Sequence, residues 1–179
     1  MEKVYLKIPS KQDLWFKKEM KEDPFTMDYN AGYNVSYNGY NYDNGTIDTD
    51  LSDLENTWFF NWINNFPSNY YAYIVETKSN KFVGEVYAKY HSSKSSYEIG
   101  IVIKGEFREK GYSKIAIKLL CENLKNLGVK KLFHEIPSTR ISAIKADIFN
   151  GFVVVKENIL CPFLKFGKQE YLTILEKDL

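Results

Sequence analysis

The residues best suited to chemistry lie within 105–114, in the stretch Gly-Glu-Phe-Arg-Glu-Lys-Gly-Tyr-Ser-Lys. An apolar run over 97–103 precedes it and favours a β-strand, and a helical pattern begins at Ser113. The free backbone N–H groups and the positive dipole end of a helix N-terminus attract anions. The stretch adds three basic side chains, namely Arg108, Lys110 and Lys114. We therefore expect a ligand that carries phosphate to bind here.

The glycine spacing separates this stretch from two common phosphate loops. A P-loop has four residues between its glycines, followed by Lys and Ser or Thr. Here five residues separate Gly105 from Gly111, and Tyr112 follows. The G-x-G-x-x-G pattern of dinucleotide-binding proteins is also absent. Gly111 suits a turn that needs a positive φ or a close approach to phosphate, and Ser113 is suited to capping the helix.

Hydropathy patterns predict the elements that hold this stretch. Strands are expected over 4–8, 70–76, 81–90, 95–103, 131–136, 152–155 and 171–175. Helices are expected over 11–21, 54–65, 113–127 and from Ser138 or Thr139 to Asn150. The turn at 77–80 predicts a hairpin. This order predicts a mixed α/β sheet in a single domain that spans residues 1–179.

Composition limits the class of protein. The chain has 179 residues, 44% hydrophobic and 26% charged, which is typical of a globular domain. It contains no apolar run of membrane-spanning length, and its first residues lack a signal-peptide core, so we expect a cytoplasmic protein. The widely spaced Cys121 and Cys161 indicate neither a disulfide framework nor a zinc site. Cys121 falls on an apolar helix face, where we expect a buried, inert thiol.

Charge is unevenly distributed, although the net charge is only +1. Residues 22–77 contain nine acidic residues and no Lys or Arg, so the remainder carries all 24 basic residues. Within this acidic part, residues 23–56 are rich in Asn, Tyr, Gly and Asp and lack periodicity. A loop of this length is usually functional or mobile.

The stretch resembles the acyl-CoA loop of the GCN5-related N-acetyltransferases, the GNAT superfamily. Their motif, Gln/Arg-x-x-Gly-x-Gly/Ala, lies between the fourth strand and the third helix. Residues 108–113 match it, except that Ser113 replaces the last small residue. The apolar strand before it, the lysine-bearing helix after it and a later helix that ends at Gly151-Phe152 are also similar to the family. The resemblance covers most of the chain and is weakest over residues 23–56.

The resemblance implies a fold of the α/β (α+β) class. Its sheet is single, mixed, mostly antiparallel and seven-stranded, and strands four and five splay into a cleft that holds acetyl-CoA. Gly100 is expected to mark a bulge in strand four. Pantetheine would bond the backbone of Ile101, Val102 and Ile103. The pyrophosphate would lie against Arg108, Glu109, Lys110, Gly111, Tyr112 and Ser113. Arg140 is also expected to contact the cofactor, and no metal is expected.

Acetyl transfer to an amine needs a base for the amine proton and a donor for the oxyanion. A backbone N–H of strand four, freed by the bulge, would serve as the donor. Glu98 is the preferred base because a carboxylate desolvated between strands binds protons more strongly, and Glu85 is the second candidate. The alternative is that both are ordinary surface glutamates. His134 lies near the cleft, but a lone histidine is more often a surface or satisfied residue.

The leaving-group acid is where the family pattern fails. Many members carry a tyrosine on the helix before Gly151-Phe152, and this chain has none there. No general acid is therefore assigned. A free thiol has a pKa of about 8.5, so a thiolate leaves more easily than an amine or an alcohol.

The acidic insert suggests the acceptor, because the corresponding family region lines the acceptor site. Five tyrosines recur there among the acids: Tyr29, Tyr33, Tyr37, Tyr40 and Tyr42. Carboxylates attract amines and tyrosine rings hold cations, which predicts a cationic acceptor such as a polyamine, an amino sugar or a basic peptide end. The alternative is a solvated acidic loop, or one that pairs with the basic remainder or a partner subunit.

The sequence thus predicts an acetyl-CoA-dependent N-acetyltransferase for a small-molecule or peptide amine. The alternative is a catalytically degenerate module that binds or senses acyl-CoA. Nucleic-acid binding is disfavoured because the lysines are scattered and no RNA-binding motif occurs. No membrane partner is expected. Exposed aromatic residues and the stretch Cys161-Pro-Phe-Leu, expected between the last strands, would permit a homodimer.

Overall fold

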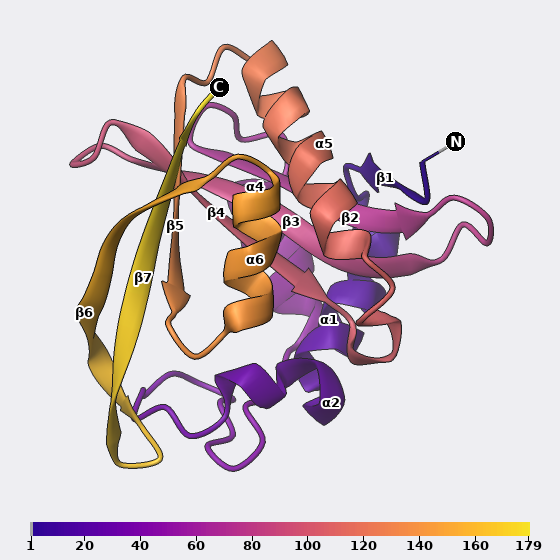
Figure 1. The fold of residues 1–179 in the computed structure, drawn as a ribbon. Coiled ribbons are helices and arrows are strands. Elements are labelled where there is room, and N and C mark those ends of the chain that lie inside the picture. Colours follow the sequence, from indigo (N-terminus) through magenta and orange to yellow (C-terminus); the bar gives the residue numbers. More distant parts are fainter. Residues whose placement is uncertain (1) are drawn as a thin grey trace.

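A seven-stranded sheet forms the centre of the computed structural model, which describes residues 2–179 (Figure 1). Its spatial order is β1-β2-β3-β4-β5-β7-β6, and all neighbours are antiparallel except the parallel pair β4 and β5. This confirms the mixed, mostly antiparallel sheet. The strands are β1 (Val4–Lys7), β2 (Asn69–Glu76), β3 (Phe82–His91), β4 (Ser96–Ile103), β5 (Lys131–Pro137), β6 (Val153–Lys165) and β7 (Lys168–Asp178).

Helices cover both faces of the sheet. They are α1 (Leu14–Glu22), α2 (Pro24–Met27), α3 (Leu51–Asp53), α4 (Phe59–Trp62), α5 (Tyr112–Asn126) and α6 (Ile141–Phe149). A π-helical turn at Leu54–Trp58 joins α3 to α4, and 3-10 turns lie at Lys11–Asp13, Asp28–Asn30 and Gly105–Phe107. None of the helices within residues 2–179 combines the length and the apolar character needed to cross a membrane.

Each face of the sheet has its own hydrophobic core. The larger core packs α5 and α6 on one face, where Ile99, Leu120 and Leu124 are buried. The smaller core packs α1 on the opposite face, where Phe16 and Tyr73 meet edge to face. In Figure 1, α5 and α6 lie in front of the sheet and α1 lies behind it. The two faces of the sheet are therefore lined by different side chains.

The cleft arises because β4 and β5 pair over only two positions. Tyr97 pairs with Leu132 and Glu98 with Phe133, and no further pairs follow. Strand β5 instead pairs with β7 along its whole length, from Lys131 to Pro137. The second half of β4 thus has no neighbour on its β5 side, which confirms the expected splay.

The expected bulge at Gly100 is not found in the β3–β4 ladder, so this prediction was wrong. The register runs without a shift from Gly84 opposite Ile103 to His91 opposite Ser96. Gly100 is needed for a different reason, since a Cβ atom there would lie 2.2 Å from Cζ of the cross-strand Tyr87. The ring of Tyr87 lies over the glycine, and no other residue type leaves room for it.

Several element ends also differ from the prediction. Residues 153–178 form one long hairpin, so Cys161 and the residues after it lie inside β6 rather than between the last strands. No side chain caps α5 or α6: Gly111 and Arg140 hold the N-cap positions, and Ser138 bonds Thr173 instead. These caps were predicted from residue type alone, whereas the β7 contact of Ser138 is a tertiary one.

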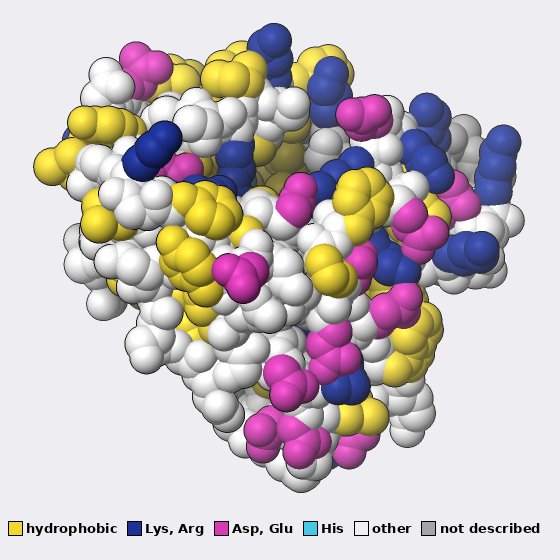
Figure 2. Space-filling model, turned by 90° about the horizontal axis from the view of Figure 1, so that it is seen from below, with side chains coloured by type: hydrophobic (Ala, Val, Ile, Leu, Met, Phe, Trp, Pro, Cys, Tyr) yellow, Lys and Arg dark blue, Asp and Glu magenta, His cyan; other side chains and the backbone are white. Residues whose placement is uncertain are grey.

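The acidic insert is ordered by turns and by contacts with the tip of the β6–β7 hairpin. Tyr33 forms an isolated bridge with Lys165, and the Phe166 amide donates to the Gly32 carbonyl at 2.6 Å. Asp23 caps α2 by accepting from two backbone amides. Figure 2 shows the molecule from below. Acidic side chains gather over the lower part of this view, and Lys and Arg side chains lie mainly toward its upper and right margins.

Candidate active site

The loop between β4 and α5 has the backbone predicted for an anion site. Gly111 is the N-cap of α5, with φ of 78°, which confirms the expected positive φ. A Cβ atom at this position would meet nothing within 4 Å, so the loop is open above the glycine. Because no side chain caps α5, its first N–H groups remain available to a ligand.

A cavity of about 550 Å³, here called the cofactor-side cavity, opens between this loop, β4, α5 and α6. Seven of the expected cofactor residues line it: Ile101, Ile103, Arg108, Glu109, Gly111, Tyr112 and Ser113. Lys114 on α5 and Ser142 on α6 add a basic and a hydroxyl side chain. The structure therefore brings most of the expected cofactor set into one place.

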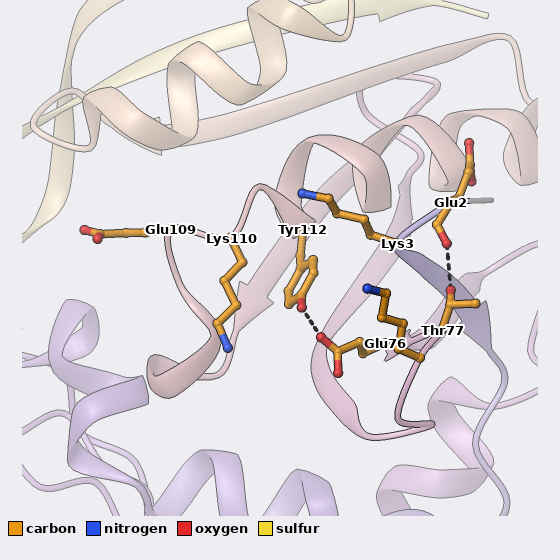
Figure 3. Close-up of a pocket in the computed structure, with 8 residues that line it drawn as sticks. Glu2, Lys3, Glu76, Thr77, Glu109, Lys110 and Tyr112 are labelled. Atoms are coloured by element: carbon orange, nitrogen blue, oxygen red, sulfur yellow. Dashed lines mark hydrogen bonds between the residues drawn. The ribbon is translucent and has the colours of Figure 1, made fainter.

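Three expected cofactor residues lie elsewhere. Lys110 faces a neighbouring cavity of about 550 Å³, which Glu109 and Tyr112 also line (Figure 3). There the Tyr112 hydroxyl donates to Glu76, which anchors the start of α5 to β2. Val102 and Arg140 line a cavity on the opposite face of the sheet.

The strand alternation of β4 decides which backbone groups face the cleft. The Lys104 amide donates to the Val83 carbonyl at 2.9 Å, so Lys104 bonds toward β3. Backbone groups of alternate residues point to alternate sides of a strand, so Val102 also bonds toward β3. Ile101 and Ile103 then present their N–H and C=O groups to the open side. These two residues are the backbone partners available to a ligand in the cleft.

A second cavity, of about 330 Å³, lies on the α1 face and is here called the acceptor-side cavity. Its polar lining includes Tyr29 from the acidic insert, Glu85 and Tyr87 from β3, and Glu135 from β5. The two cavities share four lining residues, namely Ile101, Ile103, Arg108 and His134. They therefore adjoin at the gap between β4 and β5, which joins the two faces of the sheet.

Glu85 reaches the acceptor-side cavity from a buried network. Its Oε2 lies 3.0 Å from Nζ of Lys17, and the Tyr71 hydroxyl also donates to it. The Lys17 ammonium lies 4.6 Å from the ring centroid of Trp58, within cation–π range. Lys17 and Glu85 are both buried, so the pair compensates two charges that would otherwise be costly.

Glu98 lies away from both cavities. Its Oε2 is 2.8 Å from Nε2 of His91, near the end where β4 and β5 still pair. It lines neither the cofactor-side nor the acceptor-side cavity. Of the two carboxylates singled out in the sequence, the structure places Glu85 beside the cleft.

Two arginines tie the acidic insert to the site. Arg108 donates to the Thr26 carbonyl and, at 2.9 Å, to Oδ1 of Asp28. Arg140 donates to the Tyr29 carbonyl at 2.9 Å, and its guanidinium lies 4.6 Å from the centre of that ring. The acidic insert thus pairs with basic residues from the rest of the chain, which is one of the alternatives that the sequence left open for it.

The tyrosines of the acceptor-side cavity are kept protonated. Burial, reinforced by the charges of Glu98 and Glu85, raises the pKa of Tyr87 to about 12. Burial and the charge of Glu85 also raise the pKa of Tyr29. Both hydroxyls therefore remain hydrogen-bond donors near neutral pH. Burial likewise raises the pKa of the Cys121 thiol, which keeps this cysteine protonated and inert.

The sequence did not assign a role to Asp147, which the structure places against His134. Nδ1 of His134 lies 2.7 Å from Oδ2 of Asp147, and this carboxylate is completely buried. The available indication was an acidic residue inside the apolar pattern of α6, between Ala146 and Ile148. Within residues 2–179, no group of three or more His, Cys, Asp and Glu side chains is arranged to hold a metal ion.

The sequence model of a family described as "Acetyltransferase (GNAT) domain" matches residues 11–145. The chain belongs to the GNAT acetyltransferase family. It is therefore an acetyltransferase enzyme. A search of curated protein sequences finds none that matches the chain.

Solved structures share the fold at low sequence identity. A spermidine N-acetyltransferase from Vibrio cholerae, solved with CoA and spermine, has a TM-score of 0.75 at 16% identity and covers 98% of this chain and 95% of its own. A GNAT-family acetyltransferase from Bacillus anthracis has a TM-score of 0.72 at 15% identity, with 99% and 95% covered. A putative acetyltransferase from Acinetobacter baylyi has a TM-score of 0.75 at 15% identity, with 98% and 93% covered. At these identities the likeness establishes the fold alone.

Proposed function

We propose that this GNAT enzyme transfers the acetyl group of acetyl-CoA to a primary amine by direct attack of the amine on the thioester. The observation that carries the proposal is the meeting of two cavities at the β4/β5 gap. A donor held on the α5 and α6 face and an acceptor held on the α1 face would approach each other there. Such an arrangement supplies proximity and orientation, which contribute a large part of the rate enhancement in bimolecular reactions.

The residues present fit coenzyme A. The uncapped N-terminus of α5 and the open space above Gly111 suit a pyrophosphate, with Arg108 and Lys114 supplying positive charge. The free backbone groups of Ile101 and Ile103 suit the amides of a pantetheine arm. Acetyl-CoA supplies an activated acyl group. Lys110 contributes positive charge from a neighbouring position, and Arg140 holds Tyr29 at the acceptor side. The backbone of Val102 bonds toward β3 instead.

The chain's own groups have distinct tasks in this proposal. A backbone N–H of Ile101 or Ile103 that faces the gap donates to the oxyanion. Glu85 attracts the ammonium of the acceptor and passes its first proton to water, which returns Glu85 to its starting state. The hydroxyls of Tyr29 and Tyr87 orient the amine. The sequence favoured Glu98 as the base. Its carboxylate lies outside both cavities, so we rank it second to Glu85.

We further propose that the acceptor is cationic, a small amine or a basic peptide end. Glu85 and Glu135 give the acceptor-side cavity its carboxylates. The insert's acids contribute less than their number suggests, because Asp23 and Asp50 cap helices and Asp28 pairs with Arg108. The spermidine N-acetyltransferases among the similar structures support an amine acceptor in general terms. A panel of polyamines, amino sugars, peptides and neutral amines tests this, and a preference for neutral or anionic amines would refute it.

Gly111 offers a direct test of cofactor binding, with a matched control in the same helix. Gly111→Ala and Gly128→Ala both replace a glycine of positive φ that flanks α5 and has nothing within 4 Å of its Cβ position. Each should cost about 1–2 kcal/mol of folding stability. Only Gly111→Ala should weaken acetyl-CoA binding, by about tenfold or more in titration calorimetry. Equal affinities for the two variants would contradict the assigned cofactor site.

Thiol release separates the enzyme from a degenerate binding module. An active enzyme releases free CoA only when a suitable amine is present, whereas a sensing module binds acetyl-CoA in calorimetry and releases none. The meeting of the two cavities at the β4/β5 gap supports the enzyme. Binding without thiol release for every amine in the panel would favour the sensing module.

We also propose that residues 1–179 form one N-acetyltransferase-like domain, because both cores pack on the same sheet. We also propose a cytoplasmic location. The proposed assembly is a homodimer through the sheet-edge strand β6, where Val153 and Leu160 are exposed by 64% and 63%. Analytical ultracentrifugation should show a dimer that Leu160→Glu dissociates, and a monomeric wild type would refute this part.

A further inference from the structure

The pair formed by His134 and Asp147 lies where the two cavities adjoin. His134 comes from β5 and lines both cavities, and Asp147 comes from α6 and lines the cofactor-side cavity. An acceptor nitrogen that reaches a thioester through the gap passes among the residues that both cavities share, and His134 is one of them. The pair therefore lies beside the gap in which the proposed donor and acceptor would meet.

The geometry fixes which ring nitrogen is free. Oδ2 of Asp147 lies 2.7 Å from Nδ1, and a buried carboxylate accepts a hydrogen bond. Nδ1 is then the protonated nitrogen of the neutral ring, and Nε2 keeps its lone pair. The structure pairs Nε2 with no other group of residues 2–179, and Oδ1 of Asp147 has no partner there either. Asp147 thus holds the ring for a base whose reactive atom faces the cavities.

We propose, on the basis of the proposed function, that His134 is a catalytic residue and Asp147 its positioning residue. Nε2 takes the proton that the attacking nitrogen loses as its bond to the acetyl carbon forms. It returns this proton to sulfur as the carbon–sulfur bond breaks and sulfur keeps the bonding electron pair. The ring ends in its starting state, so no further co-reactant is needed.

The carboxylates cannot perform this transfer from where they lie. Glu85 lines only the acceptor-side cavity and is held by Lys17 and Tyr71, and Glu98 lines neither. Glu85 takes the first proton of the incoming ammonium and releases it to water, whereas His134 takes the second and passes it to sulfur. The chain's other histidine, His91, also contacts a carboxylate but borders neither cavity, which makes it a matched control.

Steady-state kinetics on the full chain test the catalytic role. H134Q should lower kcat by about 100-fold or more while the Kd for acetyl-CoA stays within about threefold. Added imidazole should restore part of the rate to H134A, whereas H91Q should keep kcat within about twofold of the wild type. If the wild type turns over and H134Q retains its kcat, the inference is overturned and the proposed function stands. If the wild type releases no thiol with any amine, the proposed function fails, and the role of His134 fails with it.

The ring tautomer gives a second readout that does not depend on turnover or on the folding of a His134 variant. The chain has two histidines, so a long-range proton–nitrogen spectrum of ¹⁵N-labelled protein holds two rings, and H91Q leaves only His134. We expect protonated Nδ1 and bare Nε2 in the neutral ring. D147N should change this pattern and lower kcat by about tenfold or more, with the KM for acetyl-CoA little changed. Protonation of Nε2 in the neutral wild-type ring would overturn the inference.

Discussion

Replacing Lys17 by methionine tests the buried network that places Glu85 at the acceptor-side cavity. Nζ and Oε2 lie 3.0 Å apart, and the two side chains are 8% and 11% exposed. At an effective dielectric constant of about 20, two unit charges at this distance attract by about 5 kcal/mol, much of which offsets desolvation. Methionine keeps the packing against Trp58 and Tyr71 but leaves the Glu85 carboxylate buried without its cation. We expect K17M to lower the free energy of unfolding by about 3–5 kcal/mol.

Urea denaturation followed by tryptophan fluorescence measures this cost, and a double-mutant cycle gives its cause. K17M/E85Q removes both charges and keeps an acceptor for Tyr71, so the double variant should be more stable than K17M alone. The adjacent K18M is the matched control. Lys18 pairs with Glu22 at the surface, so its loss should cost no more than about 1 kcal/mol. A K17M cost similar to that of K18M, or additive costs in the cycle, would refute the reasoning.

The remaining predictions concern the glycines of the sheet, alkaline pH and the choice of base. Gly100→Ala should lower the free energy of unfolding by about 1 kcal/mol and disturb the acceptor side, and this cost should disappear in a Tyr87→Ala background. Gly84→Ala should keep its cost in the same background, because its Cβ would lie 2.3 Å from a backbone carbonyl oxygen. An equal G100A cost in both backgrounds would instead indicate a backbone constraint. Stability should fall as pH rises above about 10, because the unfolded chain then loses tyrosine protons that the folded chain retains. Burial raises the pKa of Tyr87 to about 12 and the pKa of Tyr71 well above its usual value. The free energy of unfolding should fall by about 1 kcal/mol per such tyrosine between pH 10 and 11, and this loss should be absent at lower pH. The loss should be smaller in Tyr87→Phe. Denaturation curves that coincide at pH 10 and pH 11 would disprove this. Glu98→Gln should keep kcat within about threefold, and a loss near 100-fold would restore Glu98 as the base.

Local chemistry made the backbone of the loop between β4 and α5 predictable. A glycine before an amphipathic helix indicates a left-handed N-cap, and Gly111 has that conformation. Gly128 likewise ends α5, where its amide donates to the Lys125 carbonyl. The hairpin of β2 and β3 followed from a short polar turn between two strand patterns. These features depend on interactions among residues close in sequence, so the sequence alone was sufficient.

Side-chain roles were less predictable because each depends on a partner far along the chain. Glu85 and Glu98 look alike in sequence, yet one meets Lys17, 68 residues away, and the other meets a histidine at the end of its own hairpin. The glycine at position 100 indicated a bulge, whereas the ring of Tyr87 is the actual reason for it. Local hydropathy indicates neither the partner of a glutamate nor the ring that packs on a glycine.

The sequence by itself determined the order of elements, the left-handed turn before α5 and the resemblance to the family, because backbone dihedral preferences and hydrophobic periodicity act over a few residues. Only the tertiary structure decided which polar groups share the cleft. The early end of the β4–β5 pairing opens the gap, and the packing of α6 on the sheet brings Asp147 to His134. Both follow from the way the strands and helices fill space around two cores, which depends on all of their side chains at once.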